Sequence, residues 1–279
     1  MTQLRPKLVA VDLDGTFLDK DSRVSPANAR IPQRLADQGI AFVVASGRIL
    51  SRFPQGLRDL PGLRYVLTAN GASVRDLTSA ELVHADLLEA ESLDRFLAAV
   101  EDLELYFEVY AEDESYVQAS RLPYFRENFY SPGKLRDMRQ SLHPIPDLRE
   151  LITRGAALQK IFIPCVSDIQ AAPLREIIEG LPELRFTSSG DRTWELNHRS
   201  CSKARGLLAL GAKLGLDATE IMAFGDARND WEMLEAVGYP VAMANADAQT
   251  RARCRYLAPH HHPDGVAQFL ETQVLGAGD

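Results

Sequence analysis

Two aspartates near the start of the chain follow a predicted strand and could do chemistry there. The run from Lys7 to Val11 predicts a buried strand, and Asp12 and Asp14 come directly after it. In an open parallel sheet ligands bind outside the carboxyl ends of the strands, so an extended chain points both carboxylates toward that crevice. Gly15 permits the turn that follows. On this motif alone, a polar turn with solvated aspartates is an equal alternative.

A second polar motif, Ser46 and Gly47, follows the apolar run from Ile40 to Ala45. This run predicts another buried strand. A hydroxyl and free backbone N–H groups that lead into a helix suit a phosphate oxygen. By itself the serine is better explained as the N-cap of that helix.

A third motif adds two carboxylates and an amide after a strand much later in the chain. Asp226, Asn229 and Asp230 follow the apolar run from Ile221 to Phe224. The alternative is a strand-to-helix turn that Asn229 or Asp230 caps. The density of acidic residues favours a functional site.

Electrostatics links these motifs. If the turns converge, Asp12, Asp14, Asp226 and Asp230 crowd one crevice, and each like-charged pair at 4 Å costs about 4 kcal/mol at an effective dielectric constant of 20. Protonation or a cation must relieve that repulsion, and a small all-oxygen ligand set suits Mg²⁺ with retained waters. Lys203, at the start of a predicted helix, could add a positive charge, although alone it would be taken as an exposed lysine.

These motifs together resemble those of the haloacid dehalogenase (HAD) superfamily. The resemblance covers nearly the whole chain and includes a long insertion between the second and third motifs, as in the Cof-type branch with a large α/β cap. The residues that carry it, in the family's order, are Asp12–Thr16, Ser46, Lys203 and Gly225–Asp230.

The resemblance implies a catalytic role for three of these residues. Asp12 would be the nucleophile that attacks phosphorus and forms an aspartyl-phosphate. Asp14 would protonate the leaving alcohol and then activate water for hydrolysis. Lys203 would spread positive charge over the group in transfer.

The resemblance also implies a phosphoryl site and a Mg²⁺ site. The residues implied for the phosphoryl oxygens are Ser46, the Gly47 amide, Asn229 and Lys203. The groups implied for Mg²⁺ are Asp12, the backbone carbonyl of Asp14, Asp226, and Asp230 as a supporting or water-mediated ligand.

The elements around the motifs predict two domains. Continuous apolar runs separated by helical segments predict a Rossmann-like parallel α/β sheet in residues 1–82 and 198–279. The insertion, residues 83–197, has strand pairs joined by short turns and two amphipathic helices, which predicts an α+β domain with helices on one side of an antiparallel sheet. We expect this insertion to be the cap.

Composition restricts the classes of partner. The 279 residues carry a net charge of −8, which argues against a nucleic-acid or anionic-membrane surface. There is no apolar run of the roughly 20 residues that a membrane span needs. The three cysteines are odd in number and far apart, which is typical of a reducing compartment. We therefore expect a cytoplasmic protein, favoured to be monomeric, whose partner is a small metabolite.

The favoured function is a Mg²⁺-dependent phosphatase that acts on small phosphorylated metabolites, with sugar phosphates as the expected class. A sugar phosphomutase is the first alternative, because it would begin with the same aspartyl-phosphate. The second is a protein that binds a phosphorylated metabolite without turnover, although the presence of both Asp12 and Asp14 argues against it.

Overall fold

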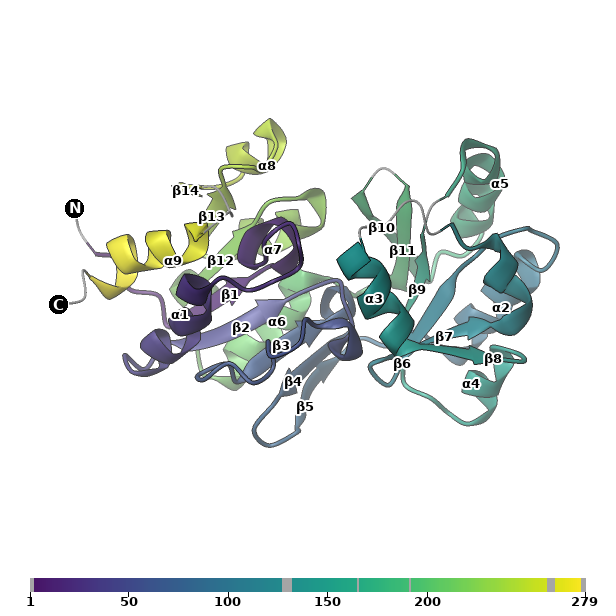
Figure 1. Cartoon of the computed structure of the whole chain (residues 1–279), viewed down its shortest axis with the longest axis horizontal. Helices are drawn as coiled ribbons and strands as arrows, with labels where there is room; N and C mark the ends of the chain where they lie inside the picture. Colours follow the sequence, from purple (N-terminus) through teal and green to yellow (C-terminus); the bar gives the residue numbers. More distant parts are fainter. Residues whose placement is uncertain (1–2, 127–131, 165, 191, 260–263, 277–279) are drawn as a thin grey trace. The chain divides into compact units, whose positions relative to one another are not determined.

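The computed structural model describes residues 3–126, 132–164, 166–190, 192–259 and 264–276 and contains two compact units (Figure 1). The first unit comprises Met1–Ser46, Phe53–Ala85 and Ser202–Asp279, and the second comprises Gly47–Arg52 and Asp86–Cys201. The insertion that we expected over residues 83–197 differs from the second unit by a few residues at each end. The expected insertion also does not include the segment Gly47–Arg52, which belongs to the second unit.

The first unit is built on an eight-stranded sheet in the order β14-β13-β12-β1-β2-β3-β4-β5. The strands from β14 to β3 in that order run parallel, and β4 and β5 continue the sheet as an antiparallel hairpin. The parallel-rich α/β sheet predicted from the apolar runs is therefore confirmed. The strands are β1 (Leu8–Val11), β2 (Ala41–Ala45), β3 (Tyr65–Thr68), β4 (Ser73–Asp76), β5 (Leu82–Ala85), β12 (Ile221–Gly225), β13 (Tyr239–Met243) and β14 (Tyr256–Ala258).

Helices cover both faces of this sheet. On one face, Leu207 and Leu210 of one helix and Leu234 of another pack in the same hydrophobic core as alternate strand residues. On the other face, Phe42 and Phe224 meet the rings of Phe17 and Phe269, respectively. The helices of this unit are α1 (Pro26–Ala36), α6 (Lys203–Lys213), α7 (Trp231–Ala236), α8 (Ala248–Ala252) and α9 (Gly265–Leu270).

The second unit has a six-stranded sheet in the order β10-β11-β9-β6-β7-β8. Its neighbouring strands are antiparallel except for the β7–β8 pair, which is parallel. Its strands are β6 (Glu108–Ala111), β7 (Glu114–Gln118), β8 (Leu142–Ile145), β9 (Leu158–Ile163), β10 (Leu184–Gly190) and β11 (Thr193–His198). Its helices are α2 (Ala90–Ala99), α3 (Pro132–Ser141), α4 (Arg149–Thr153) and α5 (Asp168–Glu179).

A separate hydrophobic core fills one face of this second sheet. Phe96 of α2, Leu151 of α4 and Leu174 of α5 pack there against alternate strand residues such as Ile161 and Leu196. The opposite face of the sheet carries buried charged residues, among them Glu108, Lys160 and Glu195, together with the stacked rings of Tyr110 and Phe162.

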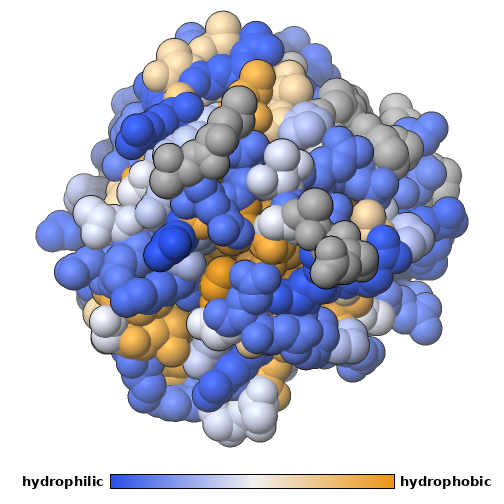
Figure 2. All heavy atoms as spheres, turned by 90° about the vertical axis from the view of Figure 1, so that its left-hand side faces the viewer, coloured by the Kyte–Doolittle hydropathy of each residue, from blue (hydrophilic) through white to orange (hydrophobic). Residues whose placement is uncertain are grey.

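The surface turned to the viewer in Figure 2 is mainly hydrophilic, with hydrophobic side chains in small groups between the polar ones. Within the described ranges no helix has both the length and the apolar character needed to cross a membrane.

Candidate active site

The strand register brings three of the predicted site residues to one edge of the first sheet. Val11 of β1 is opposite Val44 of β2 and Phe224 of β12. Asp12, Ser46 and Asp226 follow these positions by one or two residues, so they lie at the carboxyl ends of adjacent parallel strands. The chain also reverses its strand order around β1, which is where open α/β sheets form their ligand crevice.

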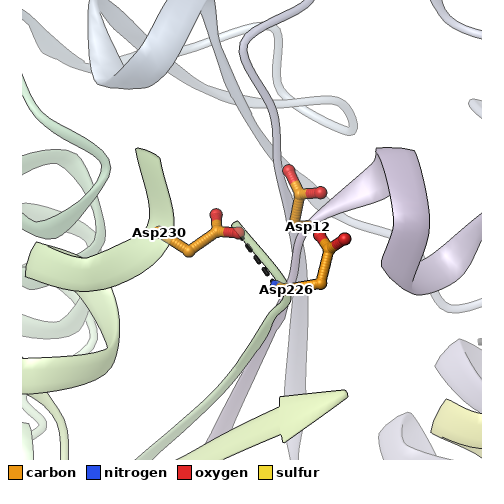
Figure 3. A group of neighbouring side chains, drawn as sticks. All are labelled: Asp12, Asp226 and Asp230. Carbon is orange, nitrogen blue, oxygen red and sulfur yellow. Dashed lines mark hydrogen bonds between the residues drawn. The ribbon is translucent and has the colours of Figure 1, made fainter. Parts of the chain in front are cut away.

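Three carboxylates converge at this edge (Figure 3). One oxygen from each of Asp12, Asp226 and Asp230 lies within 4.8 Å of the others. The second oxygen of Asp230, Oδ2, accepts hydrogen bonds from the backbone N–H groups of Asp226 at 3.1 Å and Ala227 at 3.2 Å. Asp230 therefore fixes the turn that carries Asp226.

Lys203 lies between two of these carboxylates. It is the first residue of α6, and the preceding residue, Ser202, caps the helix: its hydroxyl accepts from the Arg205 N–H at 3.2 Å. The Lys203 ammonium donates to Oδ1 of Asp12 at 2.5 Å and to Oδ1 of Asp230 at 2.7 Å. Burial alone would lower the pKa of Lys203, but the two carboxylates outweigh burial and raise it, so the amine is charged.

The aspartates are difficult to ionise together. Burial raises the pKa of Asp12 well above its ordinary value; Lys203 opposes this shift, and the charges of Asp230 and Asp226 add to it. Burial, followed by the charge of Asp230, raises the pKa of Asp226 to about 7. One ammonium does not neutralise this cluster.

The donor set fits Mg²⁺. The ion prefers oxygen ligands, binds proteins through one or two carboxylates and keeps several waters. Asp12 and Asp226 supply such carboxylates, whereas both oxygens of Asp230 already accept hydrogen bonds. Gly15 permits the approach of Asp226, since a Cβ at this glycine would lie 2.3 Å from Oδ2 of the aspartate.

The other predicted site residues have different surroundings. Asp14 is exposed and lies outside the cluster of three carboxylates, although its charge contributes to the raised pKa of Asp12. Ser46 is buried between β2 and β3, where its N–H donates to the Leu67 carbonyl at 2.8 Å. Asn229 is half-buried, one residue before Asp230. Gly47 belongs to the second unit, one peptide bond after Ser46.

Asn245 is a site residue that the sequence motifs did not reveal. Its side-chain amide donates to the Gly15 carbonyl at 2.9 Å and to Oδ2 of Asp226 at 3.1 Å. It follows β13, so its signal was again a polar residue just beyond the carboxyl end of a parallel strand. Thr16 supports the same aspartate through a long hydrogen bond of 3.4 Å to Oδ1.

Comparison with known proteins places the chain among phosphatases. A family model described as haloacid dehalogenase-like hydrolase matches residues 9–270. A 5-amino-6-(5-phospho-D-ribitylamino)uracil phosphatase of Bacillus subtilis is 27% identical, over 97% of this chain and 99% of its own length. An HMP-PP phosphatase of Shigella boydii is 28% identical, over 95% of this chain and 98% of its own length.

The fold agrees with solved structures. A haloacid dehalogenase-like hydrolase from Bacillus subtilis superposes with a TM-score of 0.81 at 25% identity, over 95% of this chain and 99% of that one.

Proposed function

The chain belongs to the haloacid dehalogenase-like hydrolase family, and we propose that it is a Mg²⁺-dependent phosphatase that works through a phosphorylated Asp12. The motif-based resemblance is thus confirmed, and the curated relatives named above are phosphatases of small phosphorylated metabolites. The observation that carries the mechanism is the buried contact of the Lys203 ammonium with Asp12, beside two further carboxylates.

Asp12 acts as the nucleophile in this mechanism. Lys203 occupies one oxygen of its carboxylate, which leaves the other for attack on phosphorus. A bond forms between that oxygen and phosphorus while the ester bond to the alcohol breaks. Because the attack brings an anion to an anionic phosphate, the ammonium of Lys203 stabilises the charge on the group in transfer.

Asp14 supplies and then removes a proton. It is two residues from the nucleophile and exposed, so it is accessible to the leaving group. As a carboxylic acid it protonates the alcohol oxygen, and as a carboxylate it then takes a proton from the water that hydrolyses the phosphoryl-aspartate. The cycle ends with free alcohol, inorganic phosphate and an unmodified Asp12.

The remaining residues bind the phosphoryl group or the metal ion. Ser46, the Gly47 amide and Asn229 are the proposed hydrogen-bond donors to the phosphoryl oxygens. Mg²⁺ would be held by Asp12 and Asp226, with the Asp14 backbone carbonyl as a third oxygen and with Asp230 in support. When bound, the ion supplies positive charge that keeps both raised-pKa carboxylates ionised and shields the incoming phosphate.

The proposed substrates are small phosphomonoesters with an alcohol leaving group. Sugar phosphates are the expected class. The B. subtilis relative is named for the phosphate of a ribityl side chain, which is chemically similar.

The test is phosphate release from a panel of sugar phosphates, nucleotides and the compounds named for the two relatives, with Mg²⁺ or with a chelator. We expect Mg²⁺-dependent turnover that Asp12→Asn reduces to background and that Asp14→Asn lowers by about 10²–10⁴-fold. Mass spectrometry of quenched enzyme should show the phosphate on the peptide that contains Asp12. The matched control is Asp76→Asn, because Asp76 is also buried but lies at the opposite edge of the sheet, across from Tyr65.

Other outcomes would assign other functions. An isomerised sugar phosphate that forms faster than free phosphate would indicate a mutase. Binding of phosphorylated metabolites without turnover in the presence of Mg²⁺ would indicate a binding protein. Full activity of Asp12→Asn would exclude the proposed nucleophile.

A further inference from the structure

The segment Gly47–Arg52 follows Ser46 directly but packs within the second unit. Arg52 is 5% exposed, and its guanidinium donates to the carboxylate of Glu108 and to the hydroxyl of Tyr110. Both partners belong to β6, in the sheet of that unit. A buried ion pair therefore anchors the end of the segment.

Lys160 of β9 anchors the start of the same segment. Its side chain is 1% exposed, and its ammonium donates to the backbone carbonyl of Gly47 at 2.6 Å and to Oε2 of Glu195 at 2.9 Å. The ammonium also lies 5.0 Å from the centre of the Tyr110 ring and 5.5 Å from that of Phe162. The Arg52 guanidinium lies over the same two rings.

The strand register explains why these groups meet. Tyr110 is opposite Lys160, and Phe162 is opposite Glu195, on three adjacent strands. The residues next to them in each strand point to the other face, where Val109 and its neighbours form the hydrophobic core. The polar face of the sheet thus supplies one cation, Lys160, and two carboxylates, Glu108 and Glu195, that hold the segment at the Gly47 carbonyl and at Arg52.

Stability alone is a weak reason for such an arrangement. Burial lowers the pKa of Lys160, and Glu195 offsets part of that shift. A buried ion pair commonly contributes no more to stability than apolar residues of the same volume. What an apolar side chain could not do is hydrogen-bond to the Gly47 carbonyl and so fix the peptide group between Gly47 and Arg48, which begins at the Cα atom of Gly47.

We propose that Lys160 is a positioning residue for phosphoryl recognition, because it holds the backbone of Gly47 next to Ser46. The inference rests on the proposed function, in which Ser46 and the Gly47 amide bind the phosphoryl oxygens. The Gly47 N–H belongs to the preceding peptide group, whose Ser46 carbonyl accepts from the Asn70 N–H at 3.0 Å, and the two peptide groups share the Cα atom of Gly47. Lys160 therefore acts on the Gly47 N–H by fixing that Cα atom. Glu195 acts through Lys160, and Arg52 keeps the far end of the segment in place.

This role has a distinctive signature. The phosphoryl group is common to all substrates. Misplacing the donors that bind it therefore weakens the binding of every substrate, and of inorganic phosphate, by a similar factor. A residue that recognises the leaving group would instead change the preference between substrates. We expect loss of Lys160 to weaken phosphate binding by about tenfold.

Two variants separate positioning from stability. Lys160→Met keeps the volume of the side chain but leaves the buried Glu195 without its lysine, so this variant loses stability. The double variant Lys160→Met/Glu195→Gln removes that charge and should recover most of the stability. The matched control is Arg149→Met, which breaks an exposed pair with Asp94 in the same unit.

The measurements are calorimetric binding of inorganic phosphate with Mg²⁺, KM and kcat for two substrates with different leaving groups, and backbone hydrogen exchange. The proposal expects both Lys160 variants to bind phosphate about tenfold more weakly, with KM raised equally for both substrates. Exchange within residues 47–52 should be faster in both, even where the double variant is stable.

Three outcomes would overturn the inference: unchanged phosphate binding in Lys160→Met, recovery of phosphate binding together with stability in the double variant, or a changed preference between the substrates. If wild-type protein binds phosphate but hydrolyses nothing, the proposed function fails. The binding and exchange measurements then still decide whether Lys160 positions Gly47.

Discussion

Lys203 donates to Asp12 and Asp230 at once, although all three side chains are buried. A buried ion pair gives little net stability over apolar packing, and removing one partner leaves an uncompensated buried charge. We therefore attribute the arrangement to the proposed catalysis, because an ammonium fixed beside the proposed nucleophile needs no reorganisation when charge moves during attack.

Removal of this ammonium should affect turnover more than binding. We expect Lys203→Met to lower kcat by about 10²–10³-fold, the usual effect of losing one preorganised donor. Steady-state phosphate release at saturating Mg²⁺ measures this, with folding checked by circular dichroism. Lys213→Met is the control because Lys213 forms an exposed pair with Glu81 at the other end of α6. Equal kcat values in the two variants would contradict the role of Lys203.

Asn245 should act on the metal rather than on the chemical step. Its amide holds Asp226 and the Gly15 carbonyl, so Asn245→Ala frees a proposed ligand to rotate. We expect the Mg²⁺ concentration for half-maximal activity to rise about tenfold, with kcat at saturating Mg²⁺ largely retained. A Mg²⁺ titration of activity measures this in Asn245→Ala. The control variant is Gln249→Ala, because Gln249 is an exposed residue of α8. An unaltered Mg²⁺ requirement would exclude Asn245 from this role.

At the scale of elements, the start of α6 depends on a close backbone contact. Gly71 has φ of +103°, and a Cβ on it would lie 2.2 Å from the carbonyl oxygen of Ser202, the residue before Lys203. Further along the helix, a Cβ on Gly206 would lie 2.8 Å from Leu67 of β3. These contacts hold α6 against the sheet and so determine where the Lys203 ammonium lies.

Gly71→Ala should therefore impair both stability and catalysis. The added methyl group must displace Ser202, which we expect to cost about 1–3 kcal/mol beyond the strain of the left-handed conformation and to lower kcat. Gly215→Ala is the matched control: Gly215 follows α6 with φ of +71° but has nothing within 4 Å of its Cβ position. Denaturant unfolding and kcat measure the difference. The same stability loss in both variants, with kcat unchanged, would disprove the contact's importance.

Sequence patterns could predict the elements that carry the catalytic motifs, and the reason is physical. β1, β2, β3 and β12 are buried on both faces, so each leaves an apolar run, and polar residues just beyond such runs must lie at the sheet edge. The hairpin of β4 and β5 left no such signal, because Ser73–Asp76 is short and mixed and β5 is half-exposed.

Long-range pairing was beyond the sequence patterns. Lys160 and Gly47 are 113 residues apart, and no local propensity links a lysine within a strand to that carbonyl. For the same reason the segment Gly47–Arg52 could not be assigned to the second unit. Asn245 had a usable signal, its place after β13, but the motif around it is weak.

At the scale of the whole molecule, each unit has its own hydrophobic core. The core of the second unit lies between its sheet and α2, α4 and α5, and that of the first includes α6 and α7. The acidic cluster belongs entirely to the first unit. We therefore expect Mg²⁺ to protect β1 and β12 from hydrogen exchange while leaving the second unit's core strands unchanged.

The sign of the pH effect follows from Asp226. Its pKa is about 7 in the fold, chiefly from burial and then from Asp230, against an ordinary value of 3.8. Between these values the folded protein holds a proton that the unfolded chain has released. Without metal, stability from this group therefore falls as pH rises from about 4 to 7. Mg²⁺ held as proposed would bind the ionised carboxylate, so its stabilising effect should grow over the same range.

The free energies of unfolding measured with Mg²⁺ and with a chelator should therefore diverge as pH rises from about 4 to 7 and differ by a constant amount above that. At a Mg²⁺ concentration one hundred times its Kd, the gain should reach about 2.7 kcal/mol. Asp226→Asn removes the titrating group, so the metal-free variant should be more stable than wild type at about pH 8 and should gain little from Mg²⁺. If Asp226→Asn instead keeps the full Mg²⁺ effect, the ion binds elsewhere, because a site that uses the Asp226 carboxylate would be weakened by the loss of that charge.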